Sequence, residues 1–269
     1  GEVNFNYGSL LIPVSKQGKT SAEVSQIVAE AQKKFEVPGF GTNSGYSIKG
    51  IDLGSNNFRV LKKPKVAMLI GEGVNSYEAG EVWHLLDTRI HMPITKIRMN
   101  NYGSADLDAY NTLIMVSGKY SQLDSLKRQK LKNWTAKGNT LITIAGGSKW
   151  MIDKKMVKES LIKKETANEN ENKKKKEDTD IELAELTKRL PYVEASEHLG
   201  RERLGGAIFE VDLDVTHPLG FGYRSSKLPV YKNNLVFLAP SKNPYATVAK
   251  YTENPHIDGF ISKNNLEKF

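Results

Sequence analysis

Lys65-Val-Ala-Met-Leu-Ile70, followed by Gly71-Glu-Gly-Val-Asn-Ser76, is the stretch that decides the fold class. An apolar run of this length is typical of a strand buried on both faces, and the glycine turn leads to Ser76, which can cap a helix. Further apolar runs follow downstream at 94–99, 111–117 and 140–145, with helical patterns between them. Buried strands that alternate with helices predict an α/β fold with a mostly parallel sheet.

The segment before this repeat has a different character. Two short strand-like stretches, 9–14 and 46–51, flank the helical spacing of Val24, Ile27 and Phe35. Residues 1–60 are therefore predicted to form a small β-α-β module, and residues 61–269 to form the main domain. Within the latter, a charged stretch at about 164–180 contains no strong apolar residue and is expected to be a mobile loop, after which a helical pattern resumes at 181–190.

Composition limits the classes of function. The 269 residues are 39% hydrophobic, enough for a core, and no apolar run approaches the ~18 residues of a membrane span. The net charge of +8 admits an anionic ligand, but the densest basic run, 173–176, lies among carboxylates, so no nucleic-acid partner is expected. The absence of cysteine excludes disulfides, thiolate–zinc sites and cysteine nucleophiles. The chain opens without a signal sequence and is expected to be a processed or excised piece.

Three strand ends are candidate binding positions, because ligands of open α/β sheets lie beyond the carboxyl ends of the strands. Glycines there let the backbone approach a ligand, and helix N-termini add partial positive charge. The same glycines can instead only close tight turns, and the sequence leaves this alternative open. A nicotinamide or flavin site is not expected, since the dinucleotide fingerprint is incomplete. The candidate ligand-binding residues are Gly71, Glu72, Gly73, Ser117, Gly146, Gly147 and Ser148.

Ser148 and His217 are the candidate catalytic residues. Ser148 lies between an apolar strand and a helix, where α/β hydrolases display their nucleophile, and His217 lies in a turn after a predicted strand. Their alternative roles are an ordinary helix cap and a turn histidine. The five histidines show neither His-x-x-Glu nor His-Glu-x-x-His spacing, so no metal site and no cofactor are expected in this chain.

Residues 61–87, Leu61-Lys-Lys-Pro-Lys-Val-Ala-Met-Leu-Ile-Gly-Glu-Gly-Val-Asn-Ser-Tyr-Glu-Ala-Gly-Glu-Val-Trp-His-Leu-Leu-Asp87, carry a family resemblance. The chain resembles the class I glutamine amidotransferase-like domain at the C-terminus of bacterial zinc carboxypeptidases of the carboxypeptidase A type. Shorter stretches that agree are 5–8, 50–55, 216–223 and 239–246.

The resemblance implies a flavodoxin-like three-layer sandwich and an exported parent protein, periplasmic or secreted. Its metallopeptidase chemistry would be performed by a separate upstream zinc domain, the expected partner, and zinc is expected only there. A glutaminase would use a cysteine after a strand, but the matching turn is Gly146-Gly147-Ser148, and Leu219 replaces the glutamate expected after His217-Pro218.

Three hypotheses follow. The first is a non-catalytic accessory domain that packs against the peptidase domain or orients its substrate, which would be a peptide. The second is a stand-alone α/β hydrolase that uses Ser148 and His217, with backbone N–H groups near Gly71 to Gly73 as an oxyanion hole. The third is a binding module for an anionic small molecule or glycan at the strand ends. The sequence does not reveal which ligand or peptide is bound, what the oligomeric state is, or whether the family pattern continues beyond Phe269.

Overall fold

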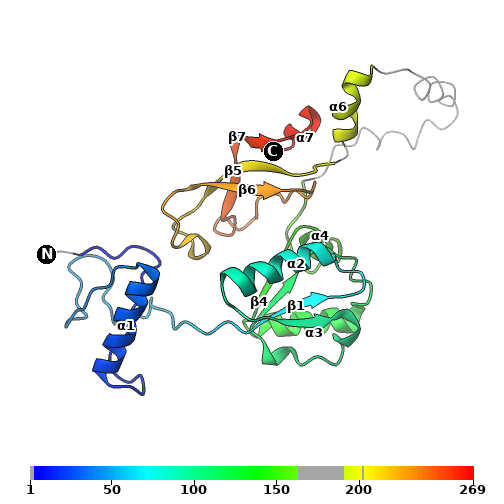
Figure 1. Cartoon of the computed structure of the whole chain (residues 1–269). Helices are drawn as coiled ribbons and strands as arrows, with labels where there is room; N and C mark the ends of the chain where they lie inside the picture. The colour runs from blue at the N-terminus through cyan, green and yellow to red at the C-terminus, as the bar shows by residue number, and fades with distance from the viewer. Residues whose placement is uncertain (1–2, 163–190, 202) are drawn as a thin grey trace. The chain divides into compact units, whose positions relative to one another are not determined.

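The computed structural model describes residues 3–162, 191–201 and 203–269 (Figure 1). The predicted loop at about 164–180 and the helical pattern at 181–190 lie outside the described residues. The chain divides into two compact units, Gly1–Lys63 and Pro64–Phe269, where the sequence placed a boundary between residues 60 and 61.

The first unit contains one helix, α1 (Ser21–Phe35). A capping box starts it: Thr20 N donates to Glu23 Oε2 at 2.7 Å, and Glu23 N donates to Thr20 Oγ1 at 3.3 Å. This contact also lowers the pKa of the exposed Glu23 carboxyl, mainly through the backbone hydrogen bond from Thr20. No strand forms at 9–14 or 46–51 among the described residues, so the predicted β-α-β module is wrong in both its strands.

The described part of this unit has no core of its own. Val24 is its one buried residue, whereas sixteen large hydrophobic side chains, among them Phe5, Phe35, Tyr46 and Val60, are exposed. A strand needs cross-strand neighbours and a buried face to be stable, and residues 9–14 and 46–51 find neither.

The second unit is built on a four-stranded parallel sheet. The strands are β1 (Val66–Ile70), β2 (Thr95–Arg98), β3 (Thr112–Met115) and β4 (Thr140–Thr143), in the spatial order β2-β1-β3-β4. All three pairings are parallel. The prediction of an α/β fold with a parallel sheet is therefore confirmed.

Helices follow three of these strands. They are α2 (Ser76–His84), which runs into a π-turn η1 (Leu85–Arg89), α3 (Ser125–Ala136) and α4 (Gly146–Asp153); short 3-10 turns lie at η2 (Met99–Asn101) and η3 (Leu107–Ala109). Asn75 caps α2 by accepting from Tyr77 N and Glu78 N, and Asp124 caps α3 by accepting from Lys127 N.

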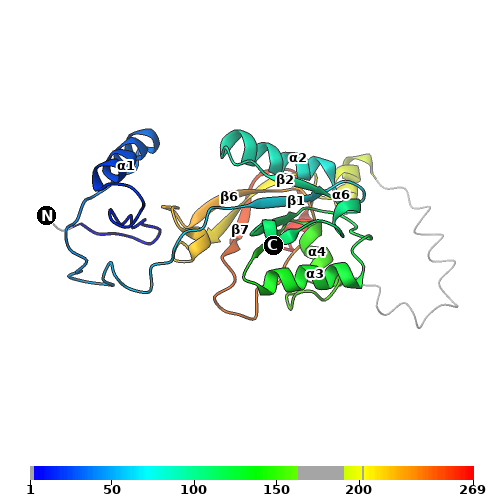
Figure 2. The ribbon, with the colours of Figure 1, turned by 90° about the horizontal axis from the view of Figure 1, so that it is seen from below.

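The helices cover both faces of the sheet, and two views show α2 and α3 on opposite sides of β1 (Figures 1 and 2). Alternate residues of each strand enter different cores, as the pleat requires. Leu69 and Met115 share one core with Trp134 of α3 and Trp150 of α4. Met68 belongs to the core on the other face, together with Ala79 of α2.

A second, antiparallel sheet has the order β6-β5-β7, with β5 (Ala207–Leu213), β6 (Lys227–Lys232) and β7 (Ala249–Gly259). Two helices belong to this part of the chain, α6 (Ala195–Gly200) and α7 (Lys263–Leu266). Two 3-10 turns accompany them: η5 (Tyr192–Glu194) precedes α6, and η6 (Pro218–Gly220) follows β5. Its core contains Phe209 stacked on Phe269, with 4.1 Å between ring centroids. Leu161 and Leu238 form an isolated antiparallel bridge outside the named strands.

Candidate functional site

The turns at the carboxyl ends of β1 and β3 are joined by backbone hydrogen bonds. Gly71 and Gly73 adopt φ values of +100° and +80°, which favour glycine, and the carbonyl of Gly73 accepts from Lys119 N at 2.8 Å. Asn75 N donates to Ser117 O at 2.8 Å. The predicted turn residues of β1 and β3 therefore lie side by side.

Ser117 connects these turns to the one after β4. Its N–H donates to Glu78 Oε2 at 2.8 Å, and its Oγ accepts from Gly146 N at 2.9 Å. The structure thus brings together the predicted residues around Gly71, Ser117 and Gly146. Glu72 lies on the exposed side, where its carboxylate accepts from Gln122 Nε2 at 3.2 Å. The hydrogen bonds described for Ser117, Gly146 and Glu72 are all made with other groups of the protein.

Ala145 is the feature that sequence reasoning missed. It lies between the end of β4 and the first residue of α4, with φ 46° and ψ −114°. A non-glycine residue rarely adopts such a conformation, and a sharp strand-to-helix turn of this kind displays the nucleophile of α/β hydrolases. The residue at this sharp turn is Ala145, whereas Ser148, the predicted candidate, lies three residues further on in the first turn of α4.

The glycine two residues further on shows why the turn has this shape. A Cβ on Gly147 would lie 2.5 Å from Met115 O and 2.7 Å from Val116 O. A side chain at this position would thus collide with the backbone of β3 and the residue after it, so α4 can start this close to the sheet only with glycine there. An elbow has the same requirement for a small residue two positions after the nucleophile.

This elbow lacks the groups that acyl transfer requires. Ala145 presents a methyl group where a hydroxyl or thiol would attack a carbonyl carbon. The next N–H, that of Gly146, would stabilise the oxyanion in a working elbow, but it already donates to Ser117 Oγ. In the described structure this turn therefore presents a methyl group at residue 145 and an N–H at residue 146 that is already bonded.

Ser148 and His217 each bond within their own segment. Ser148 Oγ lies 2.9 Å from Thr143 Oγ1 and donates to Thr143 O at 3.0 Å, which ties the first turn of α4 to the end of β4. His217 Nδ1 accepts from Leu219 N at 3.1 Å and caps η6. No hydrogen bond joins Ser148 to His217 in the described structure, so the contact required by the hydrolase hypothesis is not formed.

Two ionisable groups close in sequence to the candidate residues have perturbed pKa values, Tyr120 after Ser117 and Asp214 before His217. Burial, with a smaller contribution from the Glu78 carboxylate, raises the pKa of Tyr120, whose hydroxyl donates to Val116 O at 2.6 Å. Hydrogen bonds from Thr216 lower the pKa of the exposed Asp214 carboxyl. Tyr120 thus stays neutral and Asp214 stays ionised at physiological pH.

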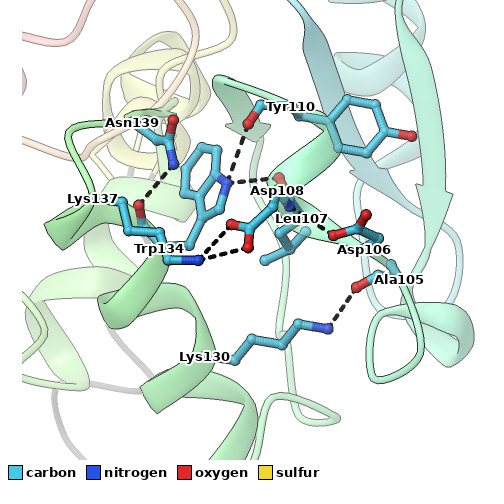
Figure 3. Close-up of polar contacts among 9 residues, drawn as sticks. All are labelled: Ala105, Asp106, Leu107, Asp108, Tyr110, Lys130, Trp134, Lys137 and Asn139. Atoms are coloured by element: carbon cyan, nitrogen blue, oxygen red, sulfur yellow. Dashed lines mark hydrogen bonds and ion pairs between the residues drawn. The ribbon is translucent and has the colours of Figure 1, made fainter.

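A groove of about 430 Å³ lies between η3 and α3. Figure 3 shows that its polar groups bind one another: Trp134 Nε1 donates to Leu107 O at 2.7 Å, and Lys137 pairs with Asp108 at 2.6 Å. Lys130 Nζ donates to Ala105 O at 2.6 Å and also to the carbonyls of Tyr102 and Gly103. The basic residues that line this groove are used within the fold, which gives the anion-binding hypothesis no support there.

Lys232 is a buried cation in the second sheet. Its Nζ donates to Val236 O at 2.7 Å and to Asn234 Oδ1 at 3.2 Å, and burial lowers its pKa to about 8. The contacts close the turn after β6, which is a structural role.

In the part of the chain that the structure describes, no three His, Asp or Glu side chains form a group that could hold a metal ion. Nor does any helix among those residues have the length and apolar character needed to cross a bilayer.

Comparisons with models of protein families, with curated proteins and with solved structures find no match to this chain.

Proposed function

We propose that this chain is a non-catalytic, glutamine amidotransferase-like accessory domain of an exported zinc metallocarboxypeptidase-like protein. In this proposal it contacts the upstream peptidase domain and orients the peptide substrate, while the zinc chemistry takes place in that other domain. The parent protein would be periplasmic or secreted.

The observation that carries the proposal is Ala145 at the elbow. The turn keeps the backbone conformation of a nucleophile position, with φ 46° and ψ −114°, but presents a methyl group. Gly147 supports the assignment, because the close contact with the carbonyls of Met115 and Val116 is what an elbow needs. A turn with the geometry and without the reactive group favours a non-catalytic member of the fold.

The sheet order is a second support. The order β2-β1-β3-β4 matches the first four positions of the flavodoxin-like order 2-1-3-4-5. In the described residues the strand that follows, β5, pairs antiparallel with β6 and β7 in a separate sheet. A flavodoxin-like fold is thus proposed for Pro64–Asp153.

Exposed apolar side chains support a partner surface. Phe5, Tyr46 and Val60 in the first unit are each more than half exposed. Apolar surface of this extent in one segment is typical of a protein contact. We assign it to the upstream peptidase domain.

Covalent probes test the absence of catalysis. The chain is incubated with a chloroketone analogue of glutamine and, separately, with a fluorophosphonate, and its intact mass is measured. We expect no adduct with either probe, because no nucleophile lies at the elbow. A fluorophosphonate adduct that is lost in Ser148→Ala would overturn the proposal in favour of a serine hydrolase.

Deletion tests the accessory role. Carboxypeptidase activity of the parent polypeptide is compared with and without the residues of this chain, using a short and a long peptide. We expect kcat/KM for the long peptide to fall and that for the short peptide to change little, since the zinc site is untouched. Equal kcat/KM values with and without this chain for both peptides would refute a substrate-orienting role.

A further inference from the structure

The outer edge of β4 has no partner strand among the described residues. β4 pairs with β3 along one edge only, and it is the last strand in the sheet order. Strands at the edge of a sheet present unpaired N–H and C=O groups that can bind another strand. This edge is therefore a candidate contact surface.

The direction of each backbone group in β4 follows from its hydrogen bonds. Thr140 N and Ile144 N each donate at 2.9 Å to a carbonyl on the β3 side. In a parallel pair alternate residues direct both groups to the same neighbour, so Ile142 faces β3 as well. Leu141 and Thr143 consequently direct their N–H and C=O groups to the free edge. The carbonyl of Thr143 also accepts from a serine hydroxyl, Ser148 Oγ, and keeps a second lone pair.

The edge lacks the features that usually prevent strand pairing. Residues 140–145 read Thr-Leu-Ile-Thr-Ile-Ala, with no charge and no proline. Ile142 is 42% exposed, and it is in register with Ile114, which packs on the α2 face of the sheet. An apolar side chain thus stands open beside unpaired backbone groups.

We propose that the outer edge of β4 binds a second copy of this chain. The two β4 strands pair antiparallel about a two-fold axis at Ile142 and join the two parallel sheets into one. In this register Leu141 of each copy lies opposite Thr143 of the other, and each pair exchanges its N–H and C=O groups.

Self-complementarity favours a second copy over a foreign strand. The register that satisfies the outward groups of Leu141 and Thr143 also places the exposed Ile142 side chains opposite each other. They form a non-hydrogen-bonded pair, in which side chains approach most closely. No charged residue of β4 meets its own copy. A two-fold contact is closed, so the β4 edge of each copy is used once and does not remain open for a third copy.

Charge substitutions at the axis test the pairing. The oligomeric state of the full chain is measured by sedimentation from about 10 µM to about 500 µM, because a contact this small gives a weak dimer. We expect a dimer fraction that rises with concentration in the wild type and is lost in both Ile142→Lys and Ile142→Glu. An equimolar mixture of the two variants should dimerise again, which misfolding could not produce. Leu126→Lys, on a residue of α3 that is 81% exposed, is the matched control and should dimerise like the wild type.

Cross-linking provides an independent measurement, because the chain has no cysteine. Ile142→Cys should form an intermolecular disulfide at least about tenfold faster than Leu126→Cys under mild oxidation, as expected for a thiol held near its own copy. A wild type that is monomeric at every concentration would overturn the proposal. Equal cross-linking rates, or a dimer that survives Ile142→Lys, would do so too.

Discussion

Gly147→Ala tests the contact on which the elbow depends. The added Cβ would lie 2.5 Å from one backbone carbonyl and 2.7 Å from another, roughly 1 Å short of ordinary van der Waals contact. Neither carbonyl can rotate away, because both belong to the buried run at the centre of the sheet. Overpacking of this kind costs about 1–3 kcal/mol or more, and alanine returns up to about 1 kcal/mol through its helix propensity. We expect a net loss of about 2 kcal/mol.

The matched control is Gly80→Ala. Gly80 lies within α2, and a Cβ there would meet no atom within 4 Å. The same substitution should therefore stabilise the protein by up to about 1 kcal/mol. The two variants should differ in unfolding free energy by about 3 kcal/mol, although both replace a helical glycine by alanine.

Urea denaturation followed by tryptophan fluorescence measures both variants. All three tryptophans lie in Pro64–Phe269, so the signal reports the unit that contains the elbow. A change of 1 kcal/mol in unfolding free energy shifts the urea midpoint by roughly 0.3–1 M, because the slope m is about 1–3 kcal/mol/M. If Gly147→Ala is as stable as Gly80→Ala, α4 does not start against β3 as described, and the reasoning on the elbow fails.

Three further predictions concern single side chains. Ala145→Cys places a thiol at the N-terminus of α4, so the pKa of that thiol should fall below the usual value of about 8.5. The pH dependence of the alkylation rate measures the thiol pKa, and Lys132→Cys, in the exposed middle of α3, is the control. The pKa of Lys232 is about 8 in the folded protein and about 10.5 in the unfolded chain, so the unfolded chain binds more protons between these pH values. The free energy of unfolding should therefore rise from pH 8 to pH 10.5 by at most about 3 kcal/mol, and urea titrations should show that this rise is lost in Lys232→Met. Lys130→Met leaves three carbonyls without their ammonium donor and should cost about 1–3 kcal/mol in thermal unfolding, against less than about 0.5 for Lys132→Met. An ordinary thiol pKa, parallel pH profiles or equal losses would contradict the respective prediction.

The parallel sheet could be predicted because its signal is local. The run Lys65–Ile70 is apolar at nearly every position, as a strand buried on both faces must be, and the observed β1 spans Val66–Ile70. The stretches at 9–14 and 46–51 carry a similar local preference but no strand. A strand depends on the neighbours it pairs with, and those are not encoded in the stretch itself.

The elbow escaped prediction because alanine carries no chemical signal. Ser148 is a residue type that can attack a carbonyl, but the residue two positions after it is Trp150 and not glycine. Counting from Ala145 instead finds Gly147 at that position. The small residue at the close contact is therefore the signal that could have located the turn, and the backbone angles of Ala145 depend on how closely α4 approaches β3.

Under the proposed non-catalytic role, Ala145 holds a conformational cost without a reaction that uses it. A non-glycine residue in such a backbone conformation costs of order 1–3 kcal/mol, and enzymes retain that cost because it displays their nucleophile. Here the turn is held from both sides, by the hydrogen bond from Gly146 N to Ser117 Oγ and by the fit of Gly147 against the sheet. Relaxing the strained residue should leave the turn in place. If the domain is non-catalytic as proposed, the elbow is a site where thermal tolerance could be gained without any loss of chemistry.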